Sequence, residues 1–316
     1  MSFCNPWSVI RELADHIKAP ERISVSEAAK KYRWVNAENY QGPWLSELAP
    51  YMNEPMDTLT SMYHEALFFV GPARSLKTDA LLLNWLVYIG LVEPSDFLAL
   101  HSSQSQSGTF SKKDLDRLFQ GMPELKGKLL PSRHADNVHE KKLRNGSFWE
   151  FRWPAMSQVT GKTVPNTFIS ELDRIKADIG GEGSTFKQLL KRTQTFNTGQ
   201  IKKGMCAVEC SPGSRYSDSK WKPTTPHEAP EVTGIFALFN QSDRRVWYWP
   251  CTKCNEYSPV KFENLVWDDA DSVLESAESV RYVCPKCGEP HYESLHKKDL
   301  NLSGAWLRER QSIDTN

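Results

Sequence analysis

Two sets of residues in this sequence have the types and the spacing to do chemistry. The first is the segment from Gly71 to Thr78, GPARSLKT, which starts with a glycine and ends in a Lys-Thr pair. Such a loop is typical of triphosphate binding. The second set consists of two C-x-x-C pairs, a spacing typical of metal binding, and its members are Cys251, Cys254, Cys284 and Cys287.

The first segment needs a strand before it and a helix after it, and the sequence predicts both. The apolar run 66–70 predicts a buried strand, and the apolar periodicity of 80–89 predicts a helix. Backbone N–H groups of the turn and of the helix N-terminus would then converge on one spot and bind a phosphate. This layout predicts that Lys77 reaches the β- and γ-phosphates of ATP and that the Thr78 hydroxyl ligates Mg²⁺.

The loop departs from the usual pattern G-x-x-x-x-G-K-[ST], because Leu76 stands where the second glycine belongs. An ordinary strand–turn–helix unit with a chance Lys-Thr pair is therefore the alternative. Upstream, Tyr40, Gln41 and Trp44 are candidates for contacting a nucleotide base, or else for the core. On the phosphate-binding hypothesis, the cofactor-binding residues are Gly71, Ser75, Lys77, Thr78, Asp173 and Gln41.

A second informative stretch carries acids where ATP hydrolysis would need them. The apolar run that starts at Thr167 predicts a short strand that ends at Glu171 and Asp173. A carboxylate at such a strand tip can orient an attacking water, and Glu171 is the candidate. Ser170 occupies the position of the usual magnesium-binding aspartate, so we expect weaker metal binding unless Asp173 turns inward. The alternative is that both acids only complement a helix dipole.

The rest of the pattern predicts the scaffold. Alternation and apolar runs predict strands at 96–101, 146–153 (in a hairpin with the preceding segment) and 205–210. Helices are expected at 6–19, from Ser24, near 111–120 and at 183–195, with a polar loop at 102–107. Strands that alternate with helices predict an α/β fold with a mostly parallel sheet. Ser211 follows the last strand, where a hydroxyl could sense the γ-phosphate or simply form a turn.

Composition sets outer limits on function. The 39 basic and 39 acidic residues give a net charge of zero, so no global basic field indicates a nucleic-acid partner. No run approaches the roughly 18 apolar residues of a membrane span, and the N-terminus lacks a signal-peptide pattern. The default expectation is a cytoplasmic protein with no membrane partner.

The four paired cysteines predict a zinc site, because in a reducing compartment such pairs indicate metal rather than disulfides. Each pair follows an aromatic-rich strand, RRVWYWP or RYV, and the second is followed by a glycine. Four thiolates can bind one Zn²⁺ tetrahedrally and leave no open coordination position, so the role is expected to be structural. A zinc ribbon with an insertion between its two halves is the expected form.

In this order the motifs resemble those of the large terminase subunits of tailed bacteriophages, of the lambda GpA type. The resemblance is carried by GPWLSELAPYMNEPMDTL, GPARSLKTD, FISELDRI, KRTQTF, CSPGSR, QSDRRVWYWPCTKC and YVCPKCG. It implies that Lys77 and Thr78 belong to the Walker A motif, together with Arg74, the arginine often found in terminase Walker A loops. It also implies that Glu171 is the Walker B catalytic glutamate and that Ser211 belongs to the coupling motif.

The resemblance further implies a P-loop NTPase of the ASCE type followed by a small zinc-ribbon subdomain. On this basis residues 1–60 form a helical segment packed on the ATPase, 61–232 the ATPase core, and 233–316 the zinc-ribbon region. The implied cofactors are ATP, Mg²⁺ and structural Zn²⁺. The family also carries a nuclease domain after these regions, and because the sequence stops at Asn316 we expect that domain to be absent.

The function that the resemblance implies is ATP-driven translocation of double-stranded DNA into a procapsid, in the host cytoplasm. The implied partners are double-stranded DNA, a small terminase subunit and a portal protein, and the chain would act in a homo-oligomeric ring. Lys162, Arg244 and Arg245 are hypothetical grips on the DNA backbone. Two alternatives remain: a helicase-type nucleic-acid-dependent ATPase, and a non-enzymatic zinc-ribbon DNA-binding or scaffold protein with a decayed nucleotide site.

Overall fold

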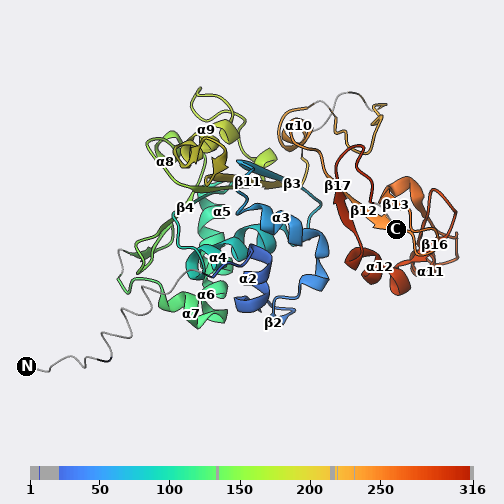
Figure 1. Cartoon of the computed structure of the whole chain (residues 1–316), viewed down its shortest axis with the longest axis horizontal. Helices are drawn as coiled ribbons and strands as arrows, with labels where there is room; N and C mark the ends of the chain where they lie inside the picture. The colour runs from blue at the N-terminus through green and yellow to red at the C-terminus, as the bar shows by residue number, and fades with distance from the viewer. Residues whose placement is uncertain are drawn as a thin grey trace, which may run out of the picture.

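A seven-stranded sheet forms the centre of the computed structural model, which describes Trp7 and residues 21–132, 135–213, 218, 220–230 and 232–313 (Figure 1). The strand order is β3-β11-β8-β4-β7-β6-β5, in which the first five strands pair in parallel and β6 pairs antiparallel with both β7 and β5. The expected α/β fold with a mostly parallel sheet is therefore confirmed. The bounds are β3 Ala66–Val70, β4 Phe97–Leu100, β5 Asp136–Asn137, β6 Glu140–Lys142, β7 Phe148–Arg152, β8 Asn166–Ser170 and β11 Met205–Cys210.

Helices cover both faces of this sheet, because successive strand residues point to opposite sides. Phe168 of β8 packs into a core with the helices that precede and follow β3, whereas Ile169 packs into a second core with the later helices. The first group comprises α2 Val25–Tyr32, α3 Asn53–Thr58, α4 Asn84–Leu91, α6 Asp116–Gly121 and α7 Pro123–Gly127. The second group comprises α8 Met156–Val159, α9 Thr185–Thr193 and α10 Ile235–Gln241.

Two helix starts show how local sequence determines these elements. Ser24 caps α2 in a reciprocal capping box with Glu27, as the Ser-x-x-Glu spacing predicts. The polar run 102–107, expected to be a loop, instead enters a helix at Gln104 (α5, Gln104–Thr109), so that expectation was wrong. Ser103 caps this helix, and the Ser107 hydroxyl donates to the Phe151 carbonyl, which satisfies polar groups that would otherwise favour a loop. The helix expected at 6–19 lies outside the described residues, apart from Trp7.

The C-terminal part of the chain forms two small antiparallel sheets beside the central one (Figure 1). The first has the order β13-β12-β17, with β12 Val246–Pro250, β13 Tyr257–Pro259 and β17 Ala305–Leu307; the second has β14 Leu265–Val266, β15 Arg281–Val283 and β16 Pro290–Tyr292. Trp306 of β17 donates its indole N–H to the carbonyl of Tyr51, 2.7 Å away. Helices α11 Val273–Glu278 and α12 Glu293–Leu302 and the hairpins β1 Trp34–Asn36/β2 Gln41–Pro43 and β9 Asn197–Thr198/β10 Ile201–Lys202 complete the fold.

Candidate active site

The loop from Gly71 to Lys77 joins the end of β3 to a helix whose first turns, Thr78–Leu83, are π-wound. A Cβ at Gly71 would lie 2.7 Å from the Phe69 ring, so the start of the loop requires a glycine. The Gly71 N–H donates to the Cys210 carbonyl at 3.2 Å, and the buried Ser75 hydroxyl donates to the Pro72 carbonyl at 2.9 Å. These bonds hold the loop against the ends of the central strands.

Two residues of this loop adopt left-handed backbone conformations. The φ angle is 63° at Arg74 and 59° at Leu76. Such a conformation costs a non-glycine residue about 1–2 kcal/mol. Leu76 therefore keeps, at that cost, a conformation that the glycine of the usual pattern would adopt freely.

The buried Lys77 ammonium is the point at which the predicted residues meet. Its Nζ lies 3.0 Å from the Ser211 hydroxyl and 3.4 Å from Oε1 of Glu171. These partners follow the ends of two neighbouring parallel strands, β11 and β8. The structure thus brings together three of the residues singled out in the sequence, although they are separated by up to 134 positions in the chain.

Glu171 has a backbone held by a hydrogen bond and a side chain that is accessible to solvent. It follows β8 in a left-handed conformation, with φ 55°, and its N–H donates to the Glu209 carbonyl at 2.9 Å. Its side chain keeps 29% exposure and also lies 3.7 Å from Arg174. A carboxylate held in this way can meet a water molecule without losing its position.

Glu209 is a site residue that sequence reasoning missed. It is the Cα partner of Ser170 on the adjacent strand, is 1% exposed, and its Oε1 accepts a 2.7 Å hydrogen bond from the Ser170 hydroxyl. Its Oε2 lies 3.5 Å from Nζ of Lys77. Burial raises the pKa of Glu209, while Ser170 and Lys77 act in the opposite direction. The signal that could have found it is a single acid in the apolar strand MCAVEC.

Asp173 lies at a different junction. Its carboxylate accepts hydrogen bonds from the backbone N–H groups of Gly213, at 2.9 Å, and Ile235, at 2.8 Å. Ile235 is the first residue of α10, and a Cβ at the preceding Gly234 would lie 2.2 Å from Asp173 Oδ1. The structure therefore places Asp173 as a tie between the end of β8 and α10, and its inward turn toward Mg²⁺ stays a prediction.

The remaining candidates lie around the loop or away from it. Thr78 is the first residue of the helix and is half-buried, whereas Arg74 is exposed. Gln41 is exposed on β2, in a hairpin whose other strand packs against α6. Trp44 is buried in the main core, as the alternative for it stated. The roles of Thr78, Arg74 and Gln41 in nucleotide binding stay predictions.

The four cysteines form a second candidate site, at the ends of β12 and β15. Their sulfur atoms all lie within 4.8 Å of one another, with 3.6 Å between Cys251 and Cys287 and 3.8 Å between Cys254 and Cys284. A regular tetrahedron with Zn–S bonds of about 2.3 Å has sulfur atoms about 3.8 Å apart. The donor set and the spacing therefore fit one Zn²⁺.

The two cysteine turns have matching backbones. The N–H of Cys251 donates to the carbonyl of Glu256, and the N–H of Cys284 donates to the carbonyl of Glu289. Four residues after the first cysteine of each turn, Asn255 and Gly288 have φ angles of 56° and 75°. Two equivalent turns that face each other are the arrangement that four-cysteine zinc sites need.

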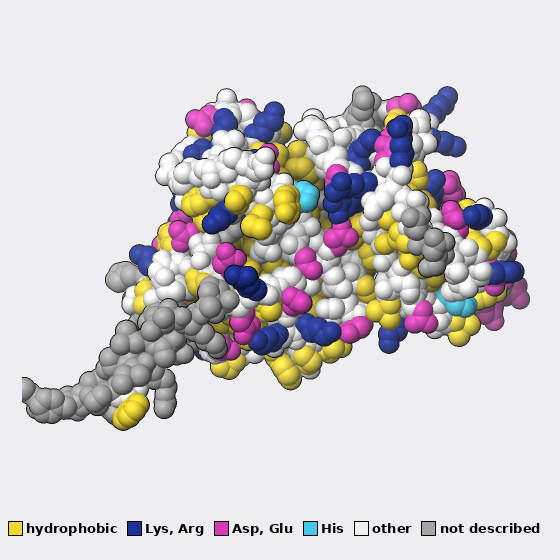
Figure 2. All heavy atoms as spheres, in the orientation of Figure 1, with side chains coloured by type: hydrophobic (Ala, Val, Ile, Leu, Met, Phe, Trp, Pro, Cys, Tyr) yellow, Lys and Arg dark blue, Asp and Glu magenta, His cyan; other side chains and the backbone are white. Residues whose placement is uncertain are grey.

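The basic residues proposed as DNA grips are ion-paired in this structure. Lys162 pairs with Glu150, Arg244 with Glu309, and Arg245 with both Glu54 and Asp243. On the face shown in Figure 2, basic and acidic side chains are interspersed, in keeping with a net charge of zero. Any grip on a phosphate backbone by these three residues would require that they exchange these partners.

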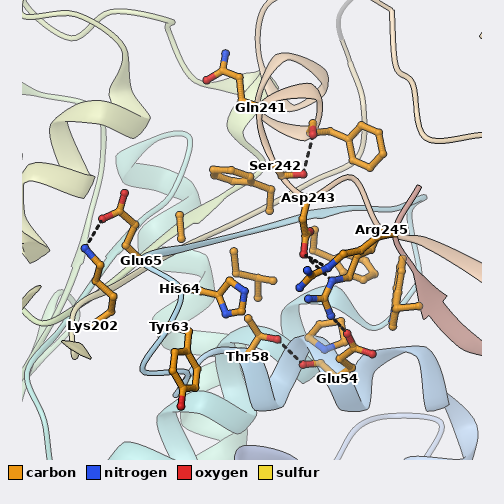
Figure 3. A pocket seen from close by; sticks show the side chains of 18 residues that line it. Glu54, Thr58, Tyr63, His64, Glu65, Lys202, Gln241, Ser242, Asp243 and Arg245 are labelled. Carbon is orange, nitrogen blue, oxygen red and sulfur yellow. Dashed lines mark hydrogen bonds and ion pairs between the residues drawn. The ribbon is translucent and has the colours of Figure 1, made fainter. Parts of the chain in front are cut away.

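A cavity of about 570 Å³ lies apart from the loop (Figure 3). It borders β3, which is the edge strand of the central sheet, and is lined by residues of α3, α10 and the C-terminal strand β17. The sequence did not predict it. Its lining includes neither Lys77 nor Glu171, so it is distinct from the site described above.

Taken together, the mostly parallel sheet and the helices on both of its faces define a protein of the α/β class, in which a loop presents Lys77 to acids of neighbouring strands. Residues 38–306 match the family model "Phage terminase large subunit gpA, ATPase domain", and the chain belongs to this family. The resemblance found in the sequence is thus confirmed.

Other comparisons are more distant. The chain is similar to the large terminase of HK97 bacteriophage, with 12% sequence identity and a TM-score of 0.43, over 61% of this chain and 38% of that one. The chain thus aligns with well under half the length of that terminase. No curated protein matches the chain. Within the described residues, every helix is too short or too polar to span a bilayer.

Proposed function

We propose that this chain binds and hydrolyses ATP, and that hydrolysis drives the movement of double-stranded DNA during phage DNA packaging. The observation that carries the proposal is the position of the Lys77 ammonium, within 3.5 Å of Glu171, Glu209 and Ser211 at the mouth of the loop. Membership in the terminase ATPase family supports the same function.

The residues divide the work of such a site. Backbone N–H groups of the loop and the Lys77 ammonium bind the phosphates, and the Thr78 hydroxyl helps to hold Mg²⁺. When bound, Mg²⁺ supplies positive charge to the oxygens of the β- and γ-phosphates. Phosphate oxygens compete for Lys77, and the Glu171 carboxylate, released from the lysine, orients the attacking water and accepts its proton.

Ser211 is the residue that we propose couples the site to moving parts. Its hydroxyl contacts the Lys77 ammonium, and two residues later Gly213 is bonded to Asp173, which also contacts the start of α10. A movement of Lys77 on nucleotide binding or release can therefore displace Ser211, Gly213 and Asp173, and through them α10, the helix that leads into the C-terminal sheets.

The test is ATP hydrolysis by the purified chain with and without double-stranded DNA. We expect Lys77→Ala to abolish nucleotide binding, and Glu171→Gln to retain binding while lowering turnover at least ~100-fold, the scale of a lost general base. Glu263→Gln, a change of an acid that is 72% exposed, is the matched control and should be neutral. Failure of the unaltered chain to bind ATP in the presence of Mg²⁺ would refute the proposal.

The same proposal extends to the chain's organisation and partners. We assign 1–60 to a segment packed on the ATPase, 61–232 to a P-loop ATPase core of the ASCE type, and 233–316 to a zinc-ribbon region with structural Zn²⁺ on the four cysteines. The proposed partners are double-stranded DNA, a small terminase subunit and a portal protein, with the chain in a homo-oligomeric ring. Analytical ultracentrifugation with and without DNA and MgATP tests the ring.

A further inference from the structure

We propose that Glu209, on β11, supplies the magnesium-binding carboxylate that Ser170, on β8, does not. This inference rests on the proposed function and names a metal-binding residue for the same site. Phosphate-binding loops of this kind work with an acid at the end of a nearby strand, which helps to hold Mg²⁺. Ser170 has the position for that role but no charge.

The sheet register places the missing charge beside Ser170. Residues that are partners on adjacent parallel strands project to the same face of the sheet, and Glu209 is the partner of Ser170. The Ser170 hydroxyl donates to Glu209 Oε1 at 2.7 Å. Ser170 of β8 therefore orients, through its hydroxyl, the carboxylate that Glu209 of β11 provides.

The second carboxylate oxygen is directed at the loop. Glu209 is 1% exposed, and its Oε2 has no hydrogen-bond partner among the described residues; its charge partner is Lys77 Nζ, 3.5 Å away. A buried carboxylate with an unsatisfied oxygen is costly, and an apolar side chain would avoid that cost. A cation that binds beside the loop would satisfy this oxygen.

The balance of charge around Lys77 also calls for a cation. Glu171 and Glu209 bring two negative charges to within 3.5 Å of a single ammonium group. The nearby Arg174 contacts Glu171 but is 75% exposed and screened by solvent. Once phosphates draw Lys77 toward the loop, the two carboxylates lose their shared counterion, and Mg²⁺ is the cation that accompanies the nucleotide.

The test compares nucleotide binding with and without Mg²⁺, with a fluorescent ATP analogue as the probe. In the unaltered chain Mg²⁺ should raise the affinity for the analogue. In Glu209→Gln, which keeps the shape of the side chain, this increase in affinity should be about 10–100-fold smaller. Affinity measured in EDTA should not fall in the variant, because without Mg²⁺ the substitution only removes a charge partner of Lys77. Mn²⁺ titrations followed by electron paramagnetic resonance, with nucleotide present, should show the same loss.

Two variants sharpen the result. Ser170→Asp combined with Glu209→Gln moves the charge back to β8 and should recover most of the lost Mg²⁺ dependence. Glu150→Gln, which removes another buried acid of the sheet, is the control and should leave that dependence intact. Undiminished Mg²⁺ dependence in folded Glu209→Gln would overturn this inference while the proposed function stood. If the unaltered chain fails to bind the analogue at all, the proposed function falls and the inference falls with it.

Discussion

The ammonium of Lys77 lies 3.0 Å from the hydroxyl of Ser211, although one follows β3 and the other follows β11. The contact joins the Gly71–Lys77 loop to the end of β11, the strand that lies between β3 and β8. In this structure the lysine is therefore held by Ser211 and Glu171, the residues that are proposed to act beside it. On the proposed function, phosphate oxygens must compete with these partners for the lysine.

Ser211→Ala should separate binding from coupling. Removal of the hydroxyl costs Lys77 one partner worth about 1 kcal/mol, so nucleotide affinity should stay the same or rise by up to about fivefold. Stimulation of ATP hydrolysis by DNA should fall, because the link from Lys77 to Gly213 and Asp173 is lost. Fluorescent-nucleotide titration and ATPase assays measure the two effects. Ser211→Thr retains a hydroxyl and serves as the control, and full DNA stimulation in Ser211→Ala would contradict the coupling role.

Leu76→Gly should stabilise the loop. At φ 59° a glycine avoids a cost of about 1–2 kcal/mol, part of which is offset by its greater freedom in the unfolded chain. The net gain in the free energy of unfolding should be about 0.5–1 kcal/mol, measured by urea denaturation. Leu76→Ala is the matched control, since it removes the same side chain but keeps the strained backbone. A glycine variant that is less stable than the alanine variant would show that the backbone is not strained there.

His101→Phe should flatten the acid limb of the stability profile. Burial lowers the pKa of His101 from 6.5 to about 4, so the folded protein favours the neutral ring. Below pH 6.5 the unfolded chain binds a proton that the folded chain does not, so stability falls as the pH drops toward 4, by a total on the order of 3 kcal/mol. Phenylalanine keeps a ring against Phe110, whose centroid is 4.7 Å away, and does not titrate. Urea denaturation at pH 7 and pH 5 measures the difference, and an unchanged slope in the variant would refute this assignment.

Cys254→Ser should release zinc from the C-terminal region. With one thiolate of four lost, bound Zn²⁺ should fall from about one per chain to well below that value, and the thermal midpoint should drop because the small sheets bury little by themselves. Metal analysis by mass spectrometry and thermal scans follow both changes. Cys206→Ala removes a buried thiol outside the cluster and should retain the metal. An unaltered chain that carries no zinc would contradict the metal site itself.

The contrast between Glu171 and Glu209 shows how far sequence reasoning reached. Glu171 was found because it follows an apolar run and comes after a Lys-Thr loop in the expected order, and its position beside Lys77 agrees with that prediction. Glu209 was missed because its relation to Ser170 depends on β11 lying between β3 and β8. No local pattern contains that strand order. The functional roles of both acids stay predictions.

Local patterns also failed where side-chain hydrogen bonds favoured a helix over a loop. The polar run 102–107 has the composition of a loop, yet Ser103 caps a helix and Ser107 finds a buried acceptor in the Phe151 carbonyl. That acceptor is 44 positions away, so the sequence alone could not show it. In contrast, the two C-x-x-C pairs were sufficient to predict that their sulfur atoms would meet, because one tetrahedral metal ion requires the thiolates of both pairs.

Tyr51 contacts both the loop and the C-terminal strand β17. Its hydroxyl lies 3.5 Å from the carbonyl of Ser75 in the loop, and its own carbonyl accepts the indole N–H of Trp306, which is 255 positions away in the chain. Any shift of the loop that displaces Tyr51 therefore also displaces Trp306 of β17. The environment of the Trp306 indole is thus expected to depend on the position of the loop.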